Sequence, residues 1–122
     1  MRPMKFLSGL SVVAIAVSAA LSPAFAHAKL VQSNPVSGSA STAPKVIKLT
    51  FDEKITPAFS GFKLSMADGM VVSTSTSLSD DGKTLIGRPT SPFMSGKWTL
   101  SWHATSVDDG HKTEGTYTFT IK

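Results

Sequence analysis

Residues 98–103 of this chain are Trp-Thr-Leu-Ser-Trp-His, a strict alternation of large apolar and polar side chains. Side chains two residues apart lie on the same face of an extended strand, so the alternation predicts a strand with one buried face. Both tryptophans would then face the core, where each would bury about 150–250 Å². His103 falls on the solvent-facing side, and nothing near it in the sequence adds a metal ligand.

The same period of two recurs on both sides of this segment. Strong alternations occupy residues 47–51, 62–66 and 117–121, and weaker ones occupy residues 29–32, 70–74 and 84–88. Turn-forming pairs separate them, among them Asn34-Pro35, Asp68-Gly69 and Asp81-Gly82. The Ser- and Thr-rich residues 73–79 are predicted to be a polar strand end or a loop. About seven short strands favour an all-β domain, an antiparallel sandwich or small barrel of immunoglobulin-like type.

The first 26 residues have the three parts of a secretory leader. Arg2 and Lys5 give a positive start, residues 7–21 are apolar apart from Ser and Gly, and residues 24–26 are Ala-Phe-Ala. Small residues of that kind are what signal peptidase requires. A membrane anchor is the alternative, but about 20 apolar residues are needed to span a bilayer and this run is shorter. We therefore expect cleavage after Ala26.

Cleavage would leave a single domain, residues 27–122, with His27 at a free N-terminus. Its net charge would be +2 instead of +4, because two basic residues leave with the leader. A charge so small and scattered gives no case for nucleic-acid binding. The chain has no cysteine, which excludes nucleophilic thiols, thiolate zinc sites and iron–sulfur clusters. Nucleophile elbows and phosphate-binding loops are absent from the sequence as well.

The three histidines are the main candidates for site chemistry. A histidine at a free N-terminus offers its α-amine and its imidazole Nδ1 to one metal ion, so His27 would form a chelate ring. Asp109-Gly110-His111 places a carboxylate two residues before an imidazole, although such a pair alone is usually a solvated loop. Together these groups make a set of three nitrogens and one oxygen, which suits tetragonal Cu(II).

On these motifs the chain resembles the CopC family of periplasmic copper-resistance proteins. The terminal histidine and the Asp-x-His motif are the most specific parts of the resemblance. The other matching segments are residues 28–31, 34–35, 47–53, 59–61, 91–92, 96–98, Trp102 and residues 115–119.

The resemblance implies a Greek-key β-sandwich or barrel that binds one Cu(II) ion through His27, Asp109 and His111. It also implies a periplasmic carrier or buffer for copper homeostasis and resistance, with an inner-membrane, CopD-like copper permease as a partner. Many members of the family have a second, methionine-rich Cu(I) site. We do not expect one at Met66 and Met70, because this segment is short and holds no histidine.

Two other functions remain open at this point. Polysaccharide mono-oxygenases also use an N-terminal histidine to bind copper, but this chain is short, and Asp109 would occupy the coordination position that oxygen needs. A metal-free sandwich that binds a protein partner is the other alternative, and exposed apolar patches would support it. We expect a carrier and no enzyme activity.

Overall fold

The computed structural model describes residues 27–122, and the predicted leader, residues 1–26, lies outside the described residues. Within this part of the chain nine strands form two sheets, and no helix is long and apolar enough to cross a membrane. The strands are β1 (Leu30–Asn34), β2 (Ala40–Ser41), β3 (Ile47–Phe51), β4 (Gly61–Met66), β5 (Val71–Val72), β6 (Thr74–Leu78), β7 (Thr84–Pro89), β8 (Gly96–Thr105) and β9 (Lys112–Ile121). A short 3-10 turn, η2 (Pro57–Phe59), precedes β4.

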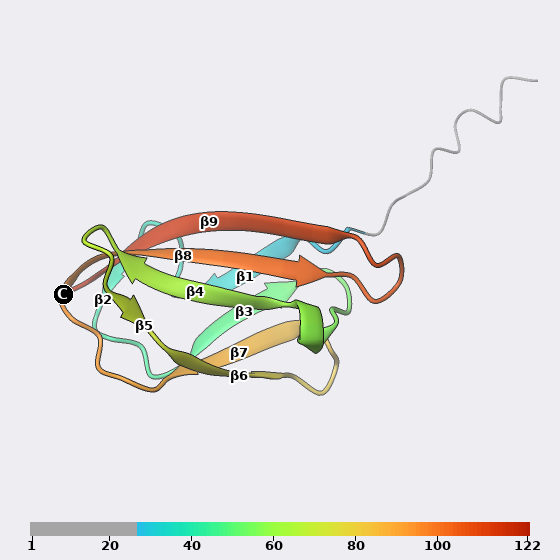
Figure 1. Ribbon diagram of the computed structural model, residues 1–122, viewed down its shortest axis with the longest axis horizontal. Coiled ribbons are helices and arrows are strands. Elements are labelled where there is room, and N and C mark those ends of the chain that lie inside the picture. The colour runs from blue at the N-terminus through green and yellow to red at the C-terminus, as the bar shows by residue number, and fades with distance from the viewer. Residues whose placement is uncertain (1–26) are drawn as a thin grey trace, which may run out of the picture.

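The two sheets pack face to face as a sandwich (Figure 1). One has the strand order β1-β3-β7-β6, and the other has the order β2-β9-β8-β4-β5. All neighbouring strands are antiparallel except β2 and β9, which are parallel. The prediction of an all-β sandwich is therefore confirmed, with two strands of only two residues among the nine.

The core lies between the sheets and contains the apolar side of each alternating segment. Trp98 and Leu100 of β8 are 0% exposed, and Trp102 is half-buried against the core, with its ring edge-on to Phe51 at 5.3 Å. The indole Nε1–H of Trp98 donates a 2.9 Å hydrogen bond to the Met94 carbonyl, so its polar atom is satisfied. The prediction that both tryptophans face the core is thus confirmed.

The Ser- and Thr-rich segment differs from its prediction. Residues 74–78 form the edge strand β6, which pairs along its whole length with β7. The middle three residues of β6 are exposed. Its stability therefore comes from backbone pairing with β7, which an apolar pattern cannot reveal.

Two segments far apart in sequence meet at one end of the sandwich (Figure 1). The segment before β1 runs beside the start of the β3–η2 connection, where the Asp52 N–H donates to the Lys29 carbonyl at 3.0 Å. The β8–β9 connection, residues 106–111, turns at the same end. This topology brings the first described residue close to the Asp-x-His motif.

Candidate metal centre

The loop between β8 and β9 is closed by its own hydrogen bonds. Ser106 is 1% exposed, and its hydroxyl donates to a carboxylate oxygen of Glu53. The Gly110 N–H donates to the Ser106 carbonyl at 3.0 Å, and the Ser106 N–H donates to the His111 carbonyl at 3.0 Å. Gly110 has a φ of 70°, a left-handed conformation that favours glycine. The loop thereby turns Asp109 and His111 toward one another.

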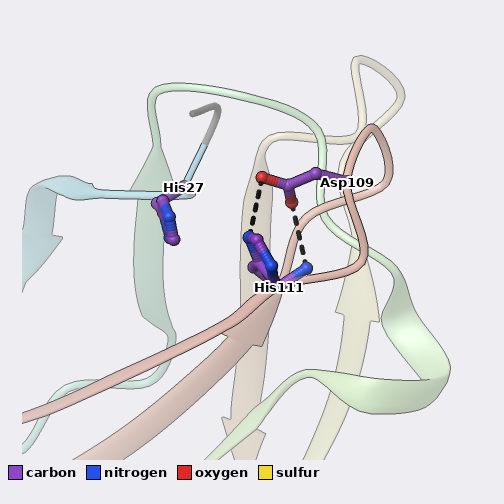
Figure 2. A group of neighbouring side chains, drawn as sticks. All are labelled: His27, Asp109 and His111. Carbon is purple, nitrogen blue, oxygen red and sulfur yellow. Dashed lines mark hydrogen bonds and ion pairs between the residues drawn. The ribbon is translucent and has the colours of Figure 1, made fainter. Parts of the chain in front are cut away.

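The carboxylate of Asp109 contacts His111 twice (Figure 2). Its Oδ1 accepts the His111 backbone N–H at 2.9 Å, and its Oδ2 lies 3.2 Å from the His111 Nδ1. The backbone hydrogen bond from His111 is the main cause that lowers the pKa of Asp109 below its ordinary value, assisted by the nearby imidazoles and opposed by desolvation. Asp109 is therefore an anionic oxygen donor at neutral pH.

His27 completes a group of three potential metal ligands. Its ring stacks on the His111 ring, with 4.8 Å between the centroids and an interplanar angle of 15°. One donor atom each from His27, Asp109 and His111 lie within 4.8 Å of one another. The structure thus brings together all three residues predicted as ligands (Figure 2).

The centre is open to solvent. The His111 side chain is 53% exposed and the Asp109 side chain is 23% exposed. An open hollow borders the β8–β9 loop, lined in part by Phe59, His103 and Val107. Phe59 and Val107 are 64% and 53% exposed, so apolar surface borders the loop that carries Asp109 and His111.

His103 lies apart from this group. It is an exposed residue of β8, in register with Gly61 of β4 and Glu114 of β9. The one group of potential metal ligands among residues 27–122 does not include it.

Comparison with known proteins gives the family. The CopC domain matches residues 30–122 of the chain. The chain belongs to the CopC family. The resemblance drawn from the sequence is confirmed by this match.

Relatives of this CopC-family chain align with it over most of their length. Copper resistance protein C of Xanthomonas campestris pv. juglandis is 39% identical over 119 residues, which cover 92% of this chain and 93% of the relative. Copper resistance protein C of Escherichia coli is 36% identical, with 95% of this chain and 94% of the relative covered.

Solved structures of the family share the fold. A crystal structure of PcoC, a copper resistance protein from Escherichia coli, has a TM-score of 0.72 at 35% identity and covers 77% of this chain and 99% of that chain. The crystal structure of CopC from Methylosinus trichosporium OB3b has a TM-score of 0.71 at 26% identity and covers 79% of this chain and 94% of that chain.

Another PcoC structure is described as that of a methionine-rich protein. In this CopC-family chain, Met66 and Met70 flank the β4–β5 turn, where the Met66 N–H donates to the Met70 carbonyl at 2.8 Å. Met66 packs against the core, whereas Met70 is 40% exposed. This turn lies at the opposite end of the sandwich from the β8–β9 loop (Figure 1). The absence of a Cu(I) site there stays a prediction.

Proposed function

We propose that this chain is a periplasmic Cu(II)-binding protein that carries or buffers copper in copper homeostasis and resistance. The observation that supports this most is the convergence of His27, Asp109 and His111, with donor atoms within 4.8 Å, in a member of the CopC family. The copper-resistance names of the relatives support copper as the ion.

In this proposal the set of four donor atoms is complete only after residues 1–26 have been removed. Cleavage after Ala26 exposes the α-amine of His27, which joins its own Nδ1, an Asp109 oxygen and a His111 nitrogen around one Cu(II) ion. The contact between Asp109 and the His111 Nδ1 favours a proton on that nitrogen. We therefore infer that His111 binds copper through Nε2.

A carrier role fits the open centre better than catalysis does. An exposed ion can pass to another protein, whereas most enzyme sites exclude water around the reacting atoms. Exposed Phe59 and Val107 beside the centre offer apolar contact area to an inner-membrane copper permease, the partner we propose. Protons compete for the amine and imidazoles, so Cu(II) affinity should fall as the pH drops below about 6.

Electron paramagnetic resonance with one equivalent of Cu(II) tests this function. The protein that begins at His27 should show three coordinated nitrogens. A matched protein that retains residues 21–26 keeps every side chain of the site, but the His27 nitrogen becomes a peptide amide and the terminal amine lies six residues away. It should therefore show one nitrogen fewer and bind Cu(II) far more weakly. Equal spectra and affinities would mean that the amine is not a ligand.

The start of the exported protein is a second check. Mass spectrometry of periplasmic material should give a chain that begins at His27. A different first residue would remove the proposed chelate and with it this function.

A further inference from the structure

Three hydrogen bonds hold the backbone that follows His27. The Thr113 hydroxyl donates to the Ala28 carbonyl at 2.7 Å. The Lys29 N–H donates to the Asp52 Oδ1 at 2.9 Å, and the Asp52 N–H donates to the Lys29 carbonyl at 3.0 Å. Ala28 itself is 1% exposed, so its side chain is packed in the core. The two residues after His27 are therefore fixed from both sides before β1 begins.

Thr113 connects this fixed segment to β9, the strand that begins directly after His111. It lies in β9 two residues after His111, and side chains two apart in an extended segment point the same way. Its hydroxyl also lies 3.4 Å from the Ala104 carbonyl of β8. A hydroxyl donates one proton, and the shorter 2.7 Å contact assigns that proton to Ala28.

We propose that Asp52 and Thr113 are positioning residues, here called the N-terminal clamp, which hold His27 opposite Asp109 and His111 before copper arrives. This proposal rests on the function proposed above. A ligand set that is already ordered loses less backbone entropy when the ion binds. Fixing the backbone of one residue is worth about 5- to 30-fold in an equilibrium constant. The clamp residues touch no ion and act only through the main chain of residues 28 and 29.

The test compares variants of Thr113 in the protein that begins at His27. Thr113→Val keeps the shape of the side chain and removes the hydroxyl, so Cu(II) affinity should fall about fivefold to tenfold. Thr113→Ser keeps the hydroxyl and should bind within about twofold of the wild type. Thr116→Val is the matched control, because Thr116 is an exposed residue of the same strand; it should also stay within about twofold.

Affinity is measured by competition with a chelator, and electron paramagnetic resonance reports whether the amine stays bound. In Thr113→Val a second copper species with one nitrogen fewer should appear, which a general loss of stability would not produce. Asp52→Ala supplies a readout without metal, because hydrogen exchange of the Lys29 amide should accelerate more than tenfold once its acceptor is gone.

Different results would refute the proposed function and the proposed clamp. A wild-type protein that binds no Cu(II) would refute the proposed function, and the role of the clamp with it. Wild-type binding that Thr113→Val leaves unchanged, or that Thr113→Ser fails to restore, would refute the clamp alone. Unchanged exchange of the Lys29 amide in Asp52→Ala would refute it as well.

Discussion

Replacing Ser106 with Ala should loosen the loop that presents Asp109 and His111 while leaving both ligands in place. The Ser106 side chain is almost fully buried, its hydroxyl donates to the Glu53 carboxylate, and its oxygen accepts the Asp108 N–H at 3.2 Å. A hydrogen bond to a charged group contributes about 1.5–3 kcal/mol to stability and a neutral one about 0.5–1.5 kcal/mol. Because Glu53 is partly exposed to solvent, we take the low end of the first range and expect a loss of about 2–3 kcal/mol.

Urea denaturation of the metal-free protein measures this loss directly. In a domain of this size each kcal/mol shifts the thermal midpoint by about 4–8 °C, so the thermal midpoint should fall by about 8–24 °C. Ser101→Ala is the matched control, because Ser101 lies on the outer, polar side of β8 and should change stability by less than about 0.5 kcal/mol. Cu(II) should also bind Ser106→Ala more weakly, because the loosened loop of the variant would have to become ordered when the ion binds.

A loss no larger than that of the control would refute the reasoning. It would mean that the hydroxyl and the carboxylate are as well satisfied by water as by one another. A large loss of stability with unchanged Cu(II) affinity would refute only the link between the loop and the ligands.

Two further substitutions test packing and hydrogen bonding elsewhere in the sandwich. Gly115→Ala places a Cβ 2.9 Å from the Trp102 ring, so we expect a destabilisation of about 1–3 kcal/mol in urea, and a stability at or above the wild type would contradict this packing. Asp81 accepts hydrogen bonds from the Ser79 hydroxyl and the Lys83 N–H, and these bonds lower its pKa. The contribution of the Asp81 carboxylate to folding stability should therefore be fully present above pH 3.8, the ordinary aspartate pKa, and should vanish as the pH falls through the lowered pKa. The difference in urea midpoint between wild type and Asp81→Asn should therefore be clear at neutral pH and disappear in acid, and a constant difference would exclude the carboxylate as its source.

The strands that sequence predicts well are those with one buried face. In β3 every second residue, Ile47, Leu49 and Phe51, is buried, so apolar periodicity and structure coincide. Strand β6 has no such contrast, because only its two ends are partly buried. Its position depends on the backbone of β7, and a partner across the sheet leaves no pattern in the strand's own residues.

The candidate ligands could be proposed from the sequence because their chemistry is local, and the structure places the three residues together. A histidine after a cleavage motif and an Asp-x-His pair are visible without a fold. The residues that support them are not visible in this way. Asp52 is 23 residues from its partner Lys29, Glu53 is 53 residues from Ser106, and Thr113 is 85 residues from Ala28. An Asp, a Glu or a Thr at such positions has no distinctive spacing, and only the tertiary fold gives each its role.

The dipeptide Asp52-Glu53 relates the two halves of the centre to one another. Asp52 accepts a hydrogen bond from the segment after His27, and Glu53 accepts one from the loop before Asp109. Both follow directly after β3, whose pairing with β1 and β7 fixes the end of that strand. Neighbouring residues cannot move far apart, so the segment after His27 and the loop before Asp109 share one anchor at the end of β3. The separation between the His27 imidazole and the Asp-x-His pair is therefore set by the sandwich, while the candidate ligands lie at one end of it, where the His111 side chain is open to solvent.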